Sequence, residues 1–409
     1  MQFSTIRIAW RNLGRNRRRT GLAMMAIAVG QFALLATNGI MHGYIDNVRN
    51  AITGPLIGHV QVHHPDWREE RAMDLSIRDY ETAMSAITET ESVEDAGARI
   101  YAPVLIAPER DAYTGVVVGA DIAFESRSYG MLSGWGRELG EKEVLLGYRL
   151  ANRMQAEVGQ EVAVVGQGAD GSIANELYTV REIIRSPVDL VNQNGIVMNL
   201  AEAQWLFMMD GQAHEIVVRS SDSGLAANLA ATLQEQPPLE GLEILPWKEL
   251  VPELVLILEM SKYAGYLVLI LVFIAAVAGV ADTLMMATFE RIREFGMLLA
   301  LGSHPRRIVG MIIVEAVLLG LLGVALGTAL GYGFVAVTAQ TGIDMASWGG
   351  EEVRDLSYQG LSLPLEIYPR LEVFDSVAGL VTVMVTALLA ALWPASLAAR
   401  LEPMEAMRA

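Results

Sequence analysis

Hydrophobic positions along this 409-residue chain gather into four long stretches that contain no charged residue. The stretches are residues 21–41, 263–281, 316–343 and 376–399. A helix of about 20 residues crosses the hydrocarbon core of a bilayer. The pattern therefore predicts an integral membrane protein with four transmembrane α-helices.

The first stretch has one alternative, the apolar region of a signal peptide that follows an Arg-rich start. Its 21 residues exceed the usual length of about 7 to 15 for such a region, and no A-x-A cleavage site closes it. We therefore interpret it as a retained span. In front of it, residues 3–13 separate apolar from basic positions at helical spacing, which is typical of an elbow helix lying in the membrane interface.

Helical apolar spacing also continues outward from two of the stretches. After span one it runs through Ile45, Val48 and Ile52 until Gly54-Pro55, and before span two it begins near Leu250. Spans one and two are therefore expected to extend beyond the membrane as a two-helix stalk.

Residues 54–247, between the stalk helices, alternate short apolar strands with helical patterns and predict a large mixed α+β domain. The expected strands are 60–62, 116–118, 162–165, 178–184, 195–198 and 215–218, and the expected helices are 79–90, 147–156, 201–209 and 223–234. The whole predicted order is an elbow helix (1–20), span one with its stalk (21–53), the α+β domain (54–247), the second stalk helix with span two (248–287), a connecting segment (288–307), span three (308–343), a loop (344–375), span four (376–399) and a tail (400–409).

Charge predicts the orientation. Six arginines and no acid occur in the first 20 residues, and residues 290–307 hold four arginines and two glutamates, so both segments are expected in the cytoplasm. The formal net charge is −17, and residues 46–262 alone carry −18. Both termini are thus predicted to lie in the cytoplasm, and the acidic domain is predicted to lie on the other side of the membrane. An acidic surface also argues against nucleic acid as a partner.

Several chemical functions lack their motifs. Each of the three lysines, Lys142, Lys248 and Lys262, stands outside a G-x-x-x-x-G-K-[ST] pattern, so the chain has no P-loop for ATP. The sequence 166–171, GQGADG, fits G-x-G-x-x-G but lies between two expected strands and reads as a hairpin turn. His59, His63 and His64 lie on a strand and turn, where their spacing does not favour a shared metal, and we expect none. There is no cysteine for a disulfide or metal.

Two features inside the spans call for close packing or pairing. Gly323, Gly327 and Gly331 form a G-x-x-x-G ridge on span three, and such ridges allow helices to approach closely. Asp282 and Glu315 are acids at the inner ends of spans two and three. They either pair with nearby arginines at the interface or take part in transport.

Three segments resemble FtsX-like permeases, the transmembrane subunits of ABC systems of the macrolide-exporter and lipoprotein-releasing types. The first is 290–308, ERIREFGMLLALGSHPRRI, followed by Glu315. The second is 9–20, AWRNLGRNRRRT, and the third is 394–406, PASLAARLEPMEA. In the external domain, 146–152 with Val158-Gly159 also looks like this family.

The resemblance implies a permease homodimer or heterodimer above a separate ABC ATPase dimer, in a bacterial inner membrane. ATP and Mg²⁺ would bind the ATPase, so no cofactor and no enzymatic activity are expected on this chain. The segment 289–299 would be the coupling helix that docks on the ATPase, and Phe295 would be part of its contact face. The implied coupling residues are Phe289, Glu290, Arg291, Ile292, Arg293, Glu294, Phe295, Gly296, Leu299 and Gly302.

Two classes of function remain open. One is a transporter subunit that extracts a lipoprotein or another amphiphile from the membrane, with membrane lipid, the cargo and a periplasmic acceptor as partners; the chain starts at the elbow, as in lipoprotein-releasing permeases, whereas macrolide exporters usually carry a fused ATPase. The other is a signalling or scaffold permease that regulates a periplasmic partner. Macrolide or peptide efflux is a further alternative.

Overall fold

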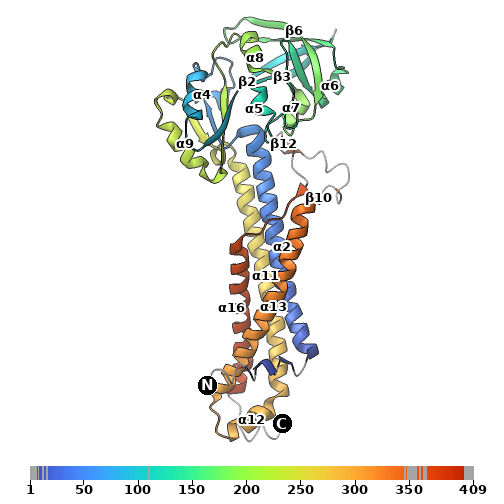
Figure 1. Cartoon of the computed structure of the whole chain (residues 1–409), viewed down its shortest axis with the longest axis vertical. Coiled ribbons are helices and arrows are strands. Elements are labelled where there is room, and N and C mark those ends of the chain that lie inside the picture. The colour runs from blue at the N-terminus through green and yellow to red at the C-terminus, as the bar shows by residue number, and fades with distance from the viewer. Residues whose placement is uncertain are drawn as a thin grey trace. The chain divides into compact units, whose positions relative to one another are not determined.

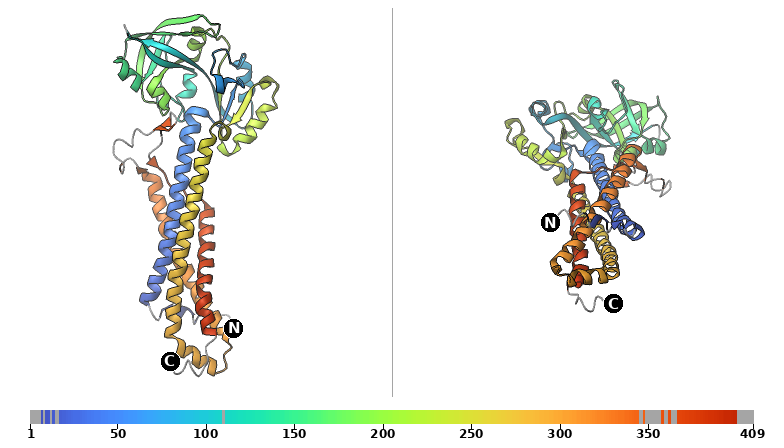
Figure 2. Two further views of the ribbon diagram at one scale, coloured as in Figure 1. Left: turned by 180° about the vertical axis from the view of Figure 1, so that it is seen from behind. Right: turned by 60° about the horizontal axis from the view of Figure 1, so that its bottom comes forward.

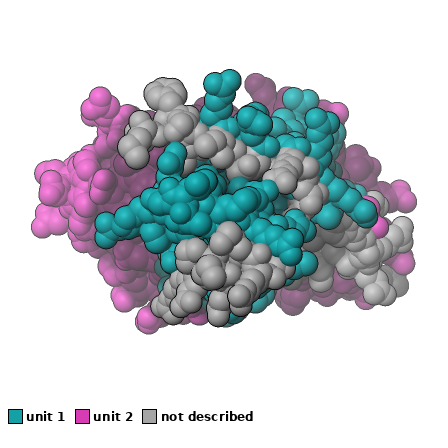
Figure 3. Space-filling model, turned by 90° about the horizontal axis from the view of Figure 1, so that it is seen from below, with its two compact units in different colours: residues 1–46, 257–345, 366–409 teal, residues 47–256, 346–365 magenta. Residues whose placement is uncertain are grey.

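The computed structural model describes residues 7, 9–11, 13–14, 17–108, 111–344, 347, 357–358, 361–362 and 366–399. The chain divides into two compact units, which Figure 3 distinguishes by colour. Unit 1 consists of Met1–Asp46, Ile257–Met345 and Glu366–Ala409, and unit 2 of Asn47–Leu256 and Ala346–Leu365. Half of the predicted elbow helix 1–20 and the whole tail 400–409 lie outside the described residues.

Unit 1 is built from long helices. They are α2 (Arg17–Ile52), α11 (Pro252–Glu290), α13 (Pro305–Thr341) and α16 (Val373–Ala399), with the short α12 (Ile292–Ala300) between α11 and α13. Within unit 1 the long helices run side by side in both views of Figure 2. Among the described residues, three segments have the length and composition of a membrane span: Thr20–Ile57, Pro305–Thr341 and Val373–Ala399. The predicted span two falls within α11 and stays a prediction.

The α13 glycines pack against α2 of the same chain. A Cβ atom at Gly323 would lie 2.6 Å from Ile27 Cγ2, one at Gly327 would lie 2.5 Å from the Ala28 carbonyl oxygen, and one at Gly331 would lie 2.8 Å from Leu35 Cδ1. No side chain fits at such distances unless the helices move apart. The ridge therefore faces α2 rather than lipid.

Unit 2 contains a nine-stranded sheet in the order β3-β7-β4-β6-β5-β2-β8-β1-β9. The strands are β1 (Val60–His63), β2 (Val93–Ala107), β3 (Tyr113–Ala120), β4 (Glu143–Gly147), β5 (Glu161–Gln167), β6 (Ile173–Ile184), β7 (Gly195–Asn199), β8 (Glu215–Ser220) and β9 (Glu243–Pro246). Because β2 also pairs with β3, the strands from β3 to β2 close into a ring. Strand β2 is shared: its first half pairs with β8, and its second half belongs to the ring.

Each part of unit 2 has its own covering helices (Figure 1). Helices α4 (Tyr80–Thr88) and α9 (Ala226–Gln234) pack on the β2, β8, β1 and β9 side. Helices α6 (Tyr148–Met154), α7 (Asp189–Asn194) and α8 (Leu200–Leu206) pack on the ring. The ring encloses a core that includes Ile100, Val144, Val162, Tyr178 and Ile196. Shorter helical segments are η1 (Thr53–Ile57), α3 (Trp67–Glu70), α5 (Ile122–Glu125), η2 (Ser223–Leu225), η3 (Pro237–Leu239) and α10 (Trp247–Leu250).

The six predicted strands and four predicted helices of this domain are all observed, with shifted ends. The sequence 166–171 connects β5 to β6 as an antiparallel hairpin, so the hairpin prediction is confirmed. Strands β2, β4 and β9 were not predicted. In the described parts of the loop 344–375, β10 (Ile343–Asp344) pairs with β13 (Glu366–Ile367), and β11 (Ser357–Tyr358) pairs with β12 (Leu361–Ser362).

Candidate coupling site

The segment between α11 and α13 is a helical hairpin with defined ends. Helix α11 continues through Phe289 and Glu290, and α12 starts only after Arg291, so the predicted helix 289–299 is two helices. Gly302, with φ of 88°, ends α12 in a left-handed conformation. Its N–H donates to the Leu299 carbonyl, and the Ser303 N–H donates to the Leu298 carbonyl, which is the Schellman arrangement. The next helix begins with Pro305 in its first turn, and His304 Nδ1 accepts from the Arg306 N–H.

Arg291 ties this hairpin together. Its Nη1 donates to Glu315 Oε2 on α13 at 2.9 Å, and both side chains are largely buried. Its Nε lies 3.6 Å from Glu294 Oε2, and its guanidinium lies 5.1 Å from the centre of the Phe295 ring. Two roles were expected for Glu315, pairing with an arginine and participation in transport, and the structure shows the pairing, with Arg291. Asp282, in contrast, is exposed on α11.

Phe295 lies in the core of unit 1, where it is 1% exposed. It belongs to the same apolar cluster as Leu284, Ile308 and Met311, and Gly296 beside it is also buried. Phe295 therefore fixes α12 to α11 and α13, and it is not available as a contact residue. Of the other predicted coupling residues, Phe289, Glu290 and Arg293 are exposed, while Ile292 and Leu299 are half-buried.

The exposed apolar surface lies on the last turn of α12 and on Leu301, the residue that follows the helix. Met297 is 52% exposed, Leu298 37% and Leu301 84%, and we call these three residues the α12 apolar patch. Apolar side chains gathered on a surface mark a contact site for another molecule. The patch was not predicted, because the apolar spacing of 289–299 does not distinguish the buried face from the exposed one.

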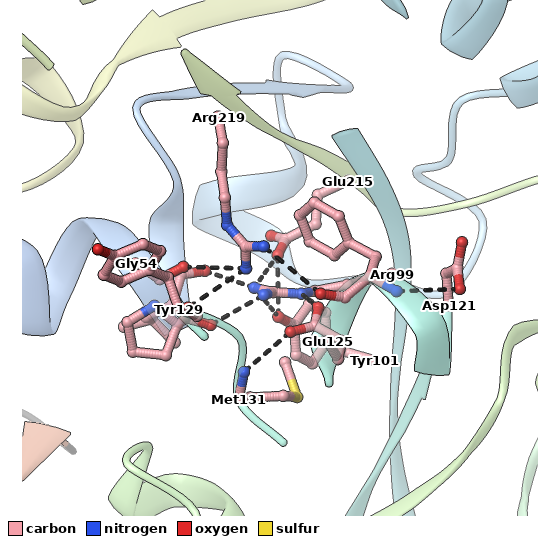
Figure 4. Close-up of polar contacts among 12 residues, drawn as sticks. Gly54, Arg99, Tyr101, Asp121, Glu125, Tyr129, Met131, Glu215 and Arg219 are labelled. Carbon is pink, nitrogen blue, oxygen red and sulfur yellow. Dashed lines mark hydrogen bonds and ion pairs between the residues drawn. The ribbon is translucent and has the colours of Figure 1, made fainter. Parts of the chain in front are cut away.

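Unit 2 holds a second polar feature, an arginine cluster formed by the buried Arg99, Arg219, Glu125 and Glu215 and the half-buried Tyr101 (Figure 4). Arg99 Nε donates to Glu125 Oε1 at 2.6 Å, and Arg99 Nη1 lies 3.5 Å from Glu215 Oε1. Tyr101 Oη donates to Glu215 Oε1 at 2.8 Å, and the Met131 N–H donates to Glu125 Oε2 at 3.0 Å. The Arg219 guanidinium lies 3.9 Å from the centre of the Phe124 ring.

Burial and pairing act in opposite directions on these groups. Burial alone would lower the pKa of Arg99, but attraction by Glu125 and Glu215 raises it, so Arg99 stays charged. Burial raises the pKa of Tyr101, and the neighbouring Glu215 raises it further. The pKa of Arg219 is lowered, chiefly by burial. Arg99 has a hydrogen-bond partner for each of its three guanidinium nitrogens, whereas Arg219 Nε has none among the described residues.

The sequence contains only a weak signal of this cluster, which the pattern of apolar positions does not bring out. Arg99 stands alone within the run Gly97-Ala-Arg-Ile-Tyr-Ala102, and Arg219 follows Ile216-Val-Val218. A single arginine inside an apolar strand is uncommon and points to a buried partner. The partner Glu125 is on α5, and no spacing rule in the sequence connects it with Arg99.

Comparison with known proteins places these features in a family. Residues 20–236 match the family described as MacB-like periplasmic core domain, and residues 266–403 match FtsX-like permease C-terminal. The chain belongs to the FtsX-like permease family. The α11–α13 hairpin, with its Arg291–Glu315 pair, lies in the permease match, and the buried arginine cluster lies in the periplasmic core match.

Relatives named for lipoprotein release and relatives named for macrolide export are both similar to this FtsX-like permease. The lipoprotein-releasing system transmembrane protein LolC of Neisseria meningitidis is 23% identical over 340 residues, 78% of this chain and 79% of that protein. LolC of Xylella fastidiosa (strain Temecula1) is 22% identical over 96% of both chains. The macrolide export ATP-binding/permease protein MacB of Chromobacterium violaceum is 24% identical over 78% of this chain, but only 50% of that protein is covered. The chain is an ABC transporter permease of the LolC/MacB type.

Proposed function

We propose that this permease couples ATP hydrolysis by a separate ATPase to movement of its periplasmic domain, and that it does so to extract a lipoprotein or a similar amphiphile from the bacterial inner membrane. In this proposal both termini and α12 face the cytoplasm, and unit 2 faces the periplasm. The permease acts as a dimer with a second permease subunit above an ATPase dimer. Nucleotide and Mg²⁺ bind the ATPase.

The observation that carries the coupling proposal is the α12 apolar patch. Met297, Leu298 and Leu301 are exposed in a segment that charge predicts to be cytoplasmic, so they are not explained by contact with lipid. At the same time, Phe295 and Arg291 fix α12 to the long helices. A contact made through the patch would therefore move α11 and α13 rather than bend a free loop.

The cargo proposal is supported by coverage of the relatives. LolC of Xylella fastidiosa, which is named for lipoprotein release, matches 96% of this chain, and MacB of Chromobacterium violaceum, which is named for macrolide export, matches 78% of it. Lipoprotein release is therefore preferred over macrolide efflux.

The coupling proposal is tested by Leu301→Asp in the full chain, purified together with its ATPase. Leu301 is 84% exposed, so the variant should fold, and a charge should weaken an apolar contact. A central interface residue contributes about 2 kcal/mol or more, which corresponds to about thirtyfold weaker binding. We expect the ATPase to be lost from the purified complex.

Leu225→Asp is the matched control, because Leu225 is 45% exposed and lies in unit 2. It should retain the ATPase. Phe295→Asp should instead prevent stable folding of unit 1, because it buries an unpaired charge. If Leu301→Asp binds the ATPase as tightly as the control, the patch is not the docking surface.

The cargo proposal is tested by mass spectrometry of what co-elutes with the complex before and after ATP is added. Acylated proteins that are present without ATP and depleted with it would support lipoprotein extraction. A cell-wall hydrolase or another periplasmic protein that stays bound in both states would support a scaffold function instead.

A further inference from the structure

The outer end of α2 is held by an unusual set of donors. After Ile52 the helix continues as the π-helix η1 (Thr53–Ile57). The last residues of α2, from Asn47 on, and all of η1 belong to unit 2. The last carbonyls of a helix have no partner inside it and carry partial negative charge. Here Arg219 Nη2 donates to the Gly54 carbonyl at 3.2 Å, Arg99 Nη2 donates to the Pro55 carbonyl at 2.8 Å, and Arg99 Nη1 donates to the Leu56 carbonyl. Three successive carbonyls are thus held by two side chains of the sheet.

The arginines are themselves fixed on their other sides. Arg99 is 0% exposed, and Glu125 holds its Nε while Glu215 lies beside its Nη1. Arg219 packs on the Phe124 ring and lies 3.9 Å from Asp95 Oδ2. A guanidinium presents its donors in a rigid planar fork, so these contacts fix direction as well as distance. Figure 4 shows the two guanidiniums converging on the segment that contains Gly54.

Arg99 lies on β2 at the point where the two parts of the sheet meet. In register it faces Glu215 of β8 on one side and Ala120 of β3 on the other. It therefore lies where β2 passes from the β8-β1-β9 part into the ring. The hydrogen bonds that Arg99 donates to η1 therefore connect the end of α2 to both parts of the sheet of unit 2.

Without these hydrogen bonds, the chain between η1 and β1 could bend easily. Two residues, Gly58 and His59, join η1 to β1, and Gly58 has φ of 68° and ψ of −167°, a conformation that glycine adopts easily. A short connection that contains a glycine can bend at that residue. The arginine contacts remove that freedom.

We propose that Arg99 and Arg219 are positioning residues that form a rigid joint between the end of α2 and the sheet of unit 2, so that the sheet turns with the helix. This proposal rests on the proposed function in one respect, that the ATPase supplies the force that moves the helix. Its rigidity is a property of unit 2 and is measured separately.

The test is the distance between two spin labels in the full chain, reconstituted with its ATPase. The chain contains no cysteine, so introduced cysteines are labelled selectively. Asn50, exposed on α2, and Ile173, 83% exposed on β6, report the helix end and the ring. In the otherwise unchanged chain we expect a narrow distance distribution that is the same with and without ATP.

Arg99→Lys keeps the charge but loses the fork, so we expect a broader distribution and less cargo released per ATP hydrolysed. Arg149→Lys is the matched control, because Arg149 lies on α6 and pairs with the buried Asp189 at 3.2 Å. It should give the narrow distribution of the unchanged chain. A merely structural role of Arg99 would alter the melting temperature without broadening the distribution of the folded chain.

If Arg99→Lys does not fold, the double variant Arg99→Met with Glu125→Leu replaces the ion pair by apolar side chains, which proteins often tolerate. It should fold and show the broad distribution. A narrow distribution in either folded variant overturns the joint, and so does failure of both to fold, since the cluster would then be a folding element. If the unchanged chain releases no cargo, the proposed function fails, while the distance distribution still decides the joint.

Discussion

At the scale of single residues, His214 is a buried group whose titration should be measurable. It is 0% exposed and stacks on Trp67, with ring centres 3.9 Å apart. The Tyr101 N–H donates to its Nδ1 at 3.0 Å, so its Nε2 carries the proton and lies 3.2 Å from the Met73 carbonyl. Binding a second proton would break the bond to Tyr101.

Burial lowers the pKa of His214 from 6.5 to about 4. Because the unfolded chain binds this proton more readily than the folded chain, the contribution of His214 to stability is full above pH 6.5 and is lost as pH falls from 6.5 toward 4. The loss is at most about 3 kcal/mol. We expect the melting temperature of the unit 2 transition in the full chain to fall across that range.

His214→Gln is the control for this titration, since it keeps hydrogen-bonding groups but binds no proton. Burial also lowers the pKa values of His59 and His63, so some pH dependence should remain in the variant. A melting temperature with the same pH dependence in the variant and the unchanged chain would rule out His214 as the source.

Residue roles could be predicted only where neighbours in the sequence decide them. The pairing of Glu315 with an arginine was one of two expected roles, because four arginines precede it in residues 290–307. The burial of Phe295 could not be predicted, since Phe295 and Leu298 share similar apolar surroundings along the chain. Arg99 and Glu125 are brought together only by the path of β2 and α5.

At the scale of elements, the contact between α2 and α13 is the clearest case of packing that depends on missing side chains. Gly327→Leu would place a side chain where even Cβ lies 2.5 Å from the Ala28 carbonyl oxygen and 2.7 Å from Gln31 Cβ. Overpacking of this kind costs about 1–3 kcal/mol or more. We expect a lower melting temperature of the chain in lipid nanodiscs.

Gly333→Leu is the matched control on the same helix, because no atom lies within 4 Å of a Cβ at Gly333. Both substitutions replace glycine with a better helix former, so only the packing differs between them. Equal melting temperatures for the two variants would contradict the α2–α13 contact.

Element prediction succeeded where one period dominates and failed where the pattern is mixed. The apolar runs of α2, α13 and α16 are long enough to be recognised without any tertiary information. Strand β2 is 15 residues long but contains Gly97, Arg99 and Pro103, which interrupt its apolar pattern. Gly97 is required there, because a Cβ at that position would lie 2.3 Å from the Phe124 ring. The parallel pairings of β3 with β7 and of β4 with β6 leave no local signal.

At the scale of the whole molecule, two helices, α2 and α11, each contain residues of both units. Helix α2 spans Arg17–Ile52 and α11 spans Pro252–Glu290, so each carries residues of unit 1 and of unit 2. Arg68 holds the short helix α10 that precedes α11, because its Nη2 donates to the carbonyl of Leu250, the last residue of α10, at 3.1 Å. Mechanical coupling requires that these helices stay continuous while the ATPase works.

The central claim is tested most directly by the amount of co-purified acylated protein released per ATP hydrolysed, measured in proteoliposomes for Leu256→Pro and for Leu256→Ala. Leu256 is 58% exposed on α11, so alanine should change little, whereas proline removes a helical hydrogen bond and kinks the helix at a cost of about 3 kcal/mol or more. The account predicts that hydrolysis continues in both variants and that release per ATP falls only with proline. Equal release per ATP in the two variants, with normal hydrolysis, would contradict transmission of force through α11.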